Sequence, residues 1–174
     1  GIAAPDYVAI ARKTAADIGY TSHAIGMDAT SEEFCEVTEL ITSQSAHINR
    51  GVVQSVDEQG AGDQGLMFGY ACDETEVYPE HQGRWMPLAI ALSQALTRRV
   101  SKLGLDGTLP WARPDAKSQV TLMHGDDGQP VHVDNVVIAV QHKDMIAEHG
   151  SEEAEQAFVR QQVIDHVIRP VVPA

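Results

Sequence analysis

A lysine close to an aspartate, just before a predicted strand, is the first candidate for chemistry in this chain. Lys117 follows Asp115 in the run Arg113-Pro114-Asp115-Ala116-Lys117, where a rigid proline leads into the strand. A lysine held in that way can contact a phosphate group as a compact positive charge. The alternative is a solvated surface lysine, which the residue types alone favour.

A second candidate is Asp63, which lies in the glycine-rich run Gly60-Ala61-Gly62-Asp63-Gln64-Gly65. Glycines at this spacing bind dinucleotides when a strand precedes them and a helix follows. Here a polar stretch precedes them and residues 65–71 predict a strand, so the run does not indicate a Rossmann site. Small neighbours still let a ligand approach the carboxylate closely. The alternative is a turn aspartate bonded to its own backbone.

Composition excludes several classes of partner. The formal net charge is −13, with only 12 lysines and arginines, which argues against nucleic acid and against an anionic membrane. No apolar run approaches the length of a membrane span and the N-terminus lacks the features of a signal peptide, so we expect a cytoplasmic protein.

The histidines and cysteines show no metal-binding spacing. Neither a His-Glu-x-x-His motif nor a Cys-x-x-Cys pair occurs, and we expect no metal site in this chain. Cys35 and Cys72 are interpreted as reduced, buried, small apolar residues. All eight histidines are interpreted as surface or sheet-face residues. No nucleophile elbow or P-loop lysine is present, so hydrolase activity has no support.

The remaining pattern predicts alternating helices and strands. Leucines at helical spacing between Pro87 and Gly104 indicate the clearest helix, and the turn at residues 125–128 joins two strands as a hairpin. The other expected elements are a helix from Asp6 to Gly19, a strand within 21–27, a short helix at 31–41, a mobile surface loop at 47–62, the strand at 65–71 and a helix from Ser151 to Pro170.

The order of strand, helix, hairpin and helix after residue 65 predicts the fold class. We expect an α+β protein built from two-layer sandwich domains, with helices on one face of a mostly antiparallel or mixed sheet. Residues 1–50 contain helices but too few strands to close a sheet alone.

Two long motifs resemble the central part of S-adenosylmethionine synthetases, also called methionine adenosyltransferases. They are GAGDQGLMFGYA at residues 60–71 and RPDAKSQVT at residues 113–121. The resemblance implies three regions: the end of the first synthetase domain at 1–50, a mobile active-site loop at 51–62 and the central domain at 63–174.

The resemblance also implies a reaction and a set of site residues. ATP and methionine would form S-adenosylmethionine, and the released triphosphate would be cleaved to pyrophosphate and phosphate, with Mg²⁺ and K⁺ as cofactors. Lys117 would lie against the ATP phosphates as the catalytic group, next to Asp115 and Ala116 in the nucleotide site. Asp63 would belong to both the ATP-binding site and the methionine-binding site. The family forms its sites between subunits, so a homodimer or homotetramer is expected.

Some parts of the chain depart from the family pattern. Gln44 would contact methionine, but Ala46-His47 replaces the Pro-Asp that follows it in the family, and Pro79 to Trp85 form an apparent insertion. The family's opening His-Pro-Asp-Lys motif and its later glycine-rich phosphate loop are missing. We therefore expect part of a longer enzyme that is inactive alone. The alternative is a non-catalytic α+β interaction module that completes a site on another chain.

Overall fold

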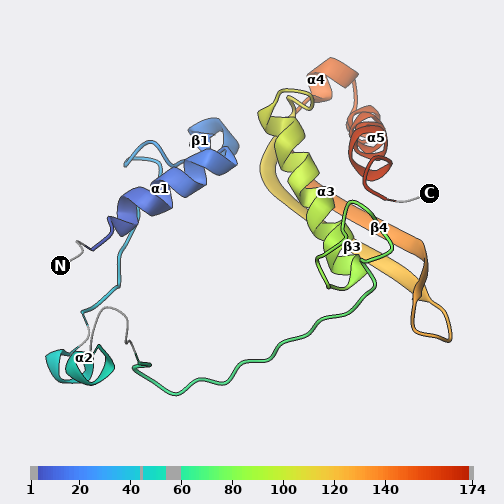
Figure 1. The fold of residues 1–174 in the computed structure, drawn as a ribbon. Helices are drawn as coiled ribbons and strands as arrows, with labels where there is room; N and C mark the ends of the chain where they lie inside the picture. Colours follow the sequence, from blue (N-terminus) through green and yellow to red (C-terminus); the bar gives the residue numbers. More distant parts are fainter. Residues whose placement is uncertain (1–3, 44, 54–59, 173–174) are drawn as a thin grey trace.

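The computed structural model describes residues 4–43, 45–53 and 60–172. Figure 1 shows an N-terminal unit, a long extended stretch and a C-terminal unit of helices on a hairpin. The elements in chain order are α1 (Tyr7–Ile18), β1 (Thr21–Ser22), a 3-10 helix (His23–Ile25), β2 (Met27–Asp28), α2 (Ala46–Val52), α3 (Leu88–Leu105), β3 (Ala112–His124), β4 (Pro130–His142), α4 (Ile146–His149), α5 (Glu152–Val163) and a π-helical turn (Ile164–Ile168).

The first predicted helix is confirmed, with both of its ends. Asp6 caps α1 by accepting a hydrogen bond from the Ala9 N–H at 2.9 Å. Gly19 ends the helix in the left-handed conformation, at a φ of 117°. The strand predicted within residues 21–27 is much shorter than expected. Two two-residue strands, β1 and β2, pair antiparallel around the 3-10 helix.

The helix predicted at residues 31–41 is wrong. Arg12 of α1 donates hydrogen bonds to the carbonyls of Ala29 at 3.2 Å, Ser31 at 3.2 Å and Cys35 at 2.7 Å. A helix that starts at Ser31 would need the Ser31 carbonyl to accept its own i to i+4 hydrogen bond. The segment therefore forms a turn and then runs without helical or strand structure, and Leu40 and Ile41 are exposed.

The surface loop predicted at residues 47–62 is also wrong for its first part. Residues 46–52 form α2, and the Val53 N–H donates to the Asn49 carbonyl at 2.9 Å, continuing the helical pattern. Residues 54–59 lie outside the part of the chain that the structure describes. The loop prediction was based on the lack of an apolar period, but a short exposed helix does not need one.

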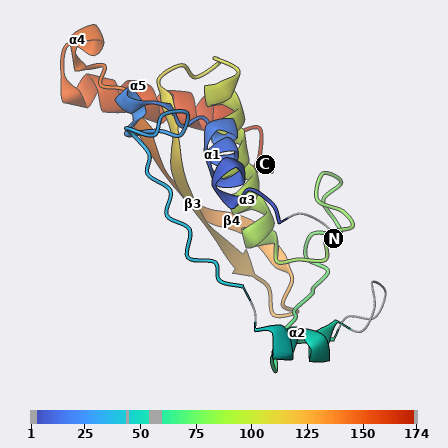
Figure 2. The ribbon, with the colours of Figure 1, turned by 90° about the vertical axis from the view of Figure 1, so that its left-hand side faces the viewer.

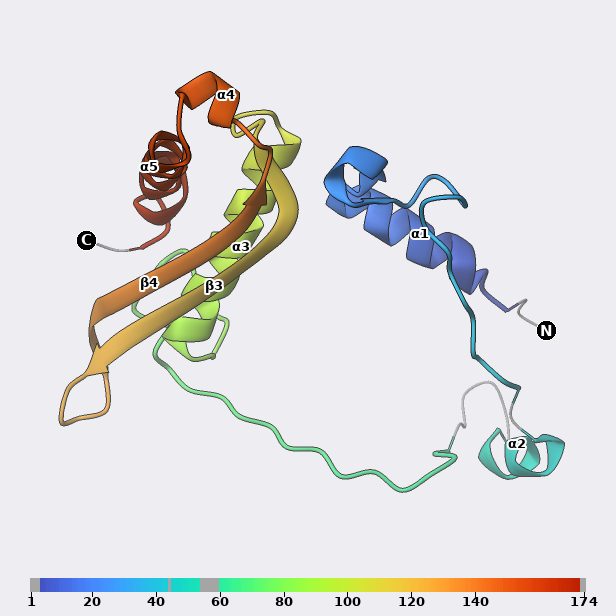
Figure 3. The same cartoon turned by 180° about the vertical axis from the view of Figure 1, so that it is seen from behind.

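Residues 65–71 have no strand partner among the described residues, so the strand predicted there is wrong for this chain as it stands. The stretch is extended in Figures 1 and 3 and leads from α2 to the C-terminal unit. Met67 is 91% exposed and Phe68 is 94% exposed. A strand is stabilised by a hydrogen-bonded neighbour and a covered face, and this segment has neither.

The leucine-rich helix is confirmed as α3 and forms the centre of the core. Leu88, Leu92, Leu96, Val100 and Leu103 are all buried along one side. Pro87 stands at the N-cap, and α3 extends one residue beyond Gly104. Burying these side chains stabilises the C-terminal unit.

The predicted hairpin is confirmed. β3 and β4 pair antiparallel, and the turn between them includes Gly128 with a φ of 78°. The helix predicted from Ser151 is also confirmed: its hydroxyl accepts a hydrogen bond from the Ala154 N–H at 3.2 Å and caps α5. The chain continues as a π-helical turn and ends its helical run before Pro170.

The fold is α+β, as predicted. α3 and α5 pack on one face of the β3–β4 hairpin, and the other face carries no helix in Figure 3. The core between the layers joins Leu96 and Val100 of α3 to Val163 of α5, with Val120 and Ile138 of the hairpin packed against them. Among the described residues, no helix has both the length and the apolar composition needed to cross a membrane.

Candidate functional site

Lys117 projects from the open face of the hairpin. It pairs with Ala139 across the ladder, and its side chain is exposed. Exposure alternates along β3: Lys117, Gln119 and Thr121 are exposed, whereas Ala116 and Val120 pack toward the core. Within the described residues, Lys117 forms no hydrogen bond or ion pair. The structure therefore presents an uncompensated cation on a face that no helix covers.

Ser118, on the opposite face of the same strand, ties β3 to α3. Its hydroxyl donates a hydrogen bond to the Ser93 carbonyl at 2.7 Å. Because side chains alternate along a strand, a serine directed at α3 places Lys117 on the far side. Asp115 is exposed and Ala116 is half-buried, next to the lysine in sequence.

The start of β3 is irregular and lies against the end of α1, which Figure 2 shows beside α3. The ladder shifts register between Ala112 and Ala116, so Arg113 and Pro114 lie at a break in the pairing. A Cβ placed on Gly19 would lie 3.2 Å from Pro114 Cγ, so the end of α1 packs closely on this proline. A cavity of about 240 Å³ lies there, lined by Gly19, Arg113 and Pro114 among other residues. The two units meet a few residues before Lys117.

The other candidate residues do not join Lys117. Asp63 is exposed, and its Oδ1 accepts a hydrogen bond from the Gln64 N–H at 2.7 Å, which is the backbone contact of the turn alternative. The segment that begins at Gly60 lies beside α2, away from the hairpin, in Figures 1 and 3. Gln44 lies outside the described residues. The structure thus brings together only Asp115, Ala116 and Lys117, which are neighbours in sequence.

Residues 73–76 hold the loop before α3 through their side chains. They were not identified from the sequence. Glu74 Oε2 accepts from the Leu88 N–H at 2.8 Å and supplies the side-chain cap that Pro87 cannot. Its Oε1 lies 3.6 Å from His124 Nε2, at the end of β3. Asp73 Oδ1 accepts from Gln129 Nε2 at 3.4 Å, and Thr75 Oγ1 accepts from the Met86 N–H at 3.4 Å.

Glu76 completes this arrangement around the apparent insertion. Its carboxylate accepts from the Gly83 N–H at 3.0 Å and from the Trp85 N–H at 3.3 Å. Trp85 is held at a φ of 52°, which is uncommon for a residue with a side chain. No local motif predicts these contacts, because Glu74 and Leu88 are 14 positions apart.

His81, in the same loop, corrects the expectation that every histidine is on the surface. His81 is only 5% exposed, and its Nδ1 atom has no hydrogen-bond partner among the described residues. Burial lowers the pKa of His81 below its usual value, and the Arg84 cation lowers it further, whereas Glu80 acts in the opposite direction. The neutral imidazole is therefore favoured in the folded loop.

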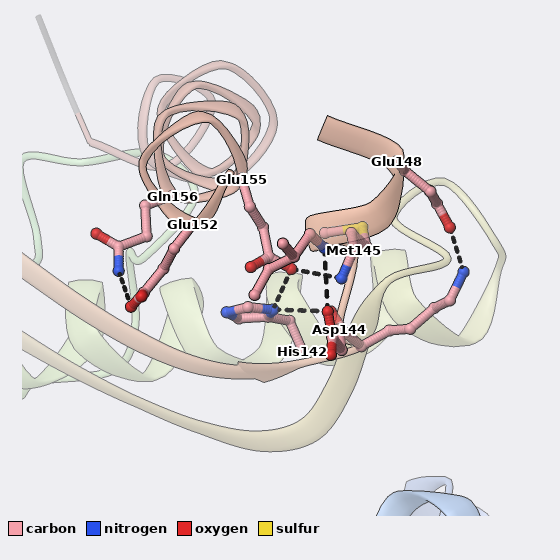
Figure 4. Close-up of polar contacts among 9 residues, drawn as sticks. His142, Asp144, Met145, Glu148, Glu152, Glu155 and Gln156 are labelled. Carbon is pink, nitrogen blue, oxygen red and sulfur yellow. Dashed lines mark hydrogen bonds and ion pairs between the residues drawn. The ribbon is translucent and has the colours of Figure 1, made fainter. Parts of the chain in front are cut away.

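A buried carboxyl holds the far end of the hairpin, as Figure 4 shows. Glu155 of α5 accepts a hydrogen bond from the Met145 N–H at 2.5 Å, and its Oε1 lies 3.8 Å from His142 Nδ1. Nearby, Lys143 pairs with Glu148 at 2.7 Å and lowers the pKa of that exposed carboxyl. These contacts join β4, α4 and α5, and they lie outside the predicted site.

The described part of the chain contains no cluster of metal ligands. Across residues 4–43, 45–53 and 60–172, no group of three or more histidine, cysteine, aspartate or glutamate side chains is arranged to hold a metal ion. Asp115 is the acidic residue closest to Lys117 in sequence, and one carboxylate makes an incomplete site for a hard cation. The described residues therefore do not fit a resident metal by themselves.

Comparisons with known proteins agree with the motifs. The family model described as the S-adenosylmethionine synthetase central domain matches residues 58–174. The chain is also 42% identical, over 176 aligned residues, to an S-adenosylmethionine synthase of Bifidobacterium adolescentis. That alignment covers 94% of this chain and 39% of the relative, so the chain spans well under half of the relative's length.

Proposed function

The chain belongs to the S-adenosylmethionine synthetase family, and from this membership we propose that it forms part of an enzyme that makes S-adenosylmethionine from ATP and methionine. The observation that carries the proposal is Lys117, an unpaired cation on the open face of β3 within the motif that resembles the family's ATP site. A chain with a net charge of −13 that leaves this lysine uncompensated is suited to an anionic ligand there. The interaction-module alternative is not favoured by this membership.

The proposed reaction makes one bond and breaks one bond at C5′ of ATP. The methionine sulfur attacks C5′, the C5′–O bond breaks, and triphosphate leaves as the sulfur becomes a sulfonium cation. Water then cleaves triphosphate to pyrophosphate and phosphate. Negative charge grows on the leaving oxygen, so a positive group placed nearby stabilises the transition state more than the ground state. We assign that role to Lys117, with Asp115 and Ala116 beside it against the nucleotide.

The remaining assignments concern methionine and the metal ions. We propose that Asp63 serves the ATP and methionine site and that Gln44 contacts methionine. Because the segment carrying Asp63 lies away from the hairpin, Asp63 and Lys117 can meet only if that segment moves or if they come from different subunits. Mg²⁺ would screen the phosphate charges, with K⁺ as a second ion. Neither fits a cluster among the described residues, so both would require ligands from elsewhere.

The division of the chain follows the same proposal. Residues 1–50 would belong to the first domain, 51–62 would close over the substrates, and 63–174 would form the central domain. The enzyme would be cytoplasmic and would assemble as a homodimer or homotetramer. We expect the 174-residue chain alone to show no turnover, because its described residues offer one unpaired phosphate contact and no metal cluster.

Ligand binding by the 174-residue chain tests the proposal directly. Calorimetric titration with inorganic tripolyphosphate and with a non-hydrolysable ATP analogue is expected to show weak binding that Lys117→Ala reduces. Lys102→Ala is the matched control, since it removes the same charge from an exposed position on α3. Equal binding by the wild type and both variants would contradict the assignment of Lys117 to the phosphates.

A further inference from the structure

The contact between Ser118 and Ser93 is a polar link inside an otherwise apolar layer. Ser118 Oγ donates to the Ser93 carbonyl at 2.7 Å, across 25 positions of sequence. Among the described residues it is the only side-chain hydrogen bond that joins β3 to α3. The neighbouring inward positions of the strand, Ala116 and Val120, meet the core through apolar contact alone. Apolar contacts are non-directional, whereas a hydrogen bond restricts both distance and angle.

The ladder is irregular just before this part of β3. Pairing with β4 shifts register between Ala112 and Ala116, runs regularly from Ala116 to Thr121, and shifts again after Thr121 and after Met123. Lys117 is therefore the second residue of the regular ladder, directly after the irregular stretch. Ser118 follows as the third, and among the described residues its hydroxyl makes the first side-chain hydrogen bond from β3 to an element outside the sheet. A shift of the strand at this point would displace Lys117 by the same amount.

The helix that receives the bond is rigid. Leu92 and Leu96 flank the acceptor along α3 and are fully buried. The Ser93 carbonyl lies within the regular helix, and Thr97 Oγ1 also approaches it, at 3.4 Å. A side chain anchored to such an element is held more exactly than one anchored to a loop.

We propose that Ser118 is a positioning residue for Lys117. Its bond to Ser93 sets the height and rotation of β3 over α3, so that the lysine on the opposite face meets a polyphosphate chain at a fixed place. The inference rests on the proposed phosphate contact of Lys117. It adds a residue that touches no substrate and acts through the strand.

The test uses the 174-residue chain with inorganic tripolyphosphate as the probe, in a double-mutant cycle. Ser118→Ala is expected to weaken binding about fivefold, the amount that corresponds to losing one typical hydrogen bond. Ser118→Thr keeps the hydroxyl and is expected to remain within about twofold of the wild type. In the Lys117→Ala background, Ser118→Ala is expected to cause no further loss. A purely structural serine would not produce that dependence on Lys117.

Thr121→Ala is the matched control, because it removes a hydroxyl from an exposed position of the same strand. Thermal unfolding of each variant establishes that the protein is folded at the titration temperature. If Lys117→Ala weakens binding and Ser118→Ala does not, or if Ser118→Ala weakens it equally without the lysine, the positioning role is overturned while the phosphate contact stands. If Lys117→Ala itself leaves binding unchanged, the proposed phosphate contact is overturned, and this inference with it.

Discussion

Glu155 of α5 accepts a hydrogen bond from the backbone N–H of Met145 at 2.5 Å, three residues after the end of β4. Glu155 is only 4% exposed, so the bond is buried, and it joins α5 to the segment that follows the hairpin carrying Lys117. A buried N–H that loses its acceptor bears the full cost of its desolvation. This single contact therefore influences how firmly α5 covers the sheet.

Glu155→Ala is expected to lower the free energy of unfolding by about 1–3 kcal/mol, because it leaves the Met145 N–H without a partner. Glu155→Gln keeps an acceptor oxygen at a similar place and is expected to lose less. Urea denaturation of the three proteins measures both values. The interpretation is contradicted if the glutamine variant is as unstable as the alanine variant.

Leu92→Ala is expected to destabilise the chain by about 2–5 kcal/mol, since this α3 side chain is fully buried and its removal leaves a cavity. Leu105→Ala is the matched control, because Leu105 is at the end of the same helix and is 60% exposed. Its expected effect is within about 0.5 kcal/mol. Similar losses for both substitutions, measured by denaturation, would mean that α3 does not anchor the core.

The buried His81 predicts a dependence of stability on pH. Its pKa is lowered in the folded protein, so below its usual value of about 6.5 the unfolded chain binds more protons than the folded chain. The contribution of His81 is fully present above that value and is lost as the pH falls through it toward the lowered folded pKa. Stability measured at pH 7.5 and 5.5 is expected to fall less in His81→Gln than in the wild type.

His132→Gln provides the control for that comparison, because it removes a titrating imidazole from an exposed position. It is expected to follow the wild-type profile. Hydrogen exchange of residues 75–86 offers a local measurement, with protection expected to decline at acidic pH in the wild type and to persist in His81→Gln. A wild-type loop that is equally protected at both pH values would contradict this account.

Lys117→Ala, introduced into an active synthetase that contains this chain, is expected to reduce turnover by about 10²-fold or more while changing methionine affinity little. The reason is that the lysine would meet charge that grows on the leaving triphosphate. Steady-state kinetics with varied methionine separates the two effects. Unchanged turnover with reduced stability would identify Lys117 as a surface charge.

Exposed apolar side chains predict association. Leu66, Met67 and Phe68 are all exposed in the segment without a strand partner, and large apolar surfaces tend to be covered by another chain. We expect a dimer or a larger species, and little loss of assembly at high salt because apolar contacts are not screened. Sedimentation at low and high salt measures this. A monomer at micromolar concentration under both conditions would count against a site shared between subunits.

Several elements could be predicted because their signals are local. The helix from Asp6 to Gly19 has a cap at each end, and α3 repeats leucines at a period that only a helix can bury. The hairpin has glycines in the turn that joins its strands. The exposure of Lys117 follows from the alternation of side chains along β3, and its role stays a prediction.

Three predictions are wrong because the outcome depends on groups outside the local segment. Arg12 takes the Ser31 and Cys35 carbonyls that a helix at 31–41 would have used. The segment at 65–71 has the residues of a strand, but pairing depends on a neighbour, and the described residues supply none. His81 is buried in a loop in which Glu76 accepts hydrogen bonds from the Gly83 and Trp85 N–H groups, seven and nine positions away.

The sequence by itself determined the family and the α+β class, because these depend on short motifs and periodicity, and it supplied the lysine that we propose as a phosphate contact. Only the tertiary structure decided which face Lys117 occupies relative to α3, through the bond from Ser118 to Ser93. It also decided that the extended segment after Gly60 lies away from the hairpin, because the placement of such a segment depends on contacts between residues far apart along the chain.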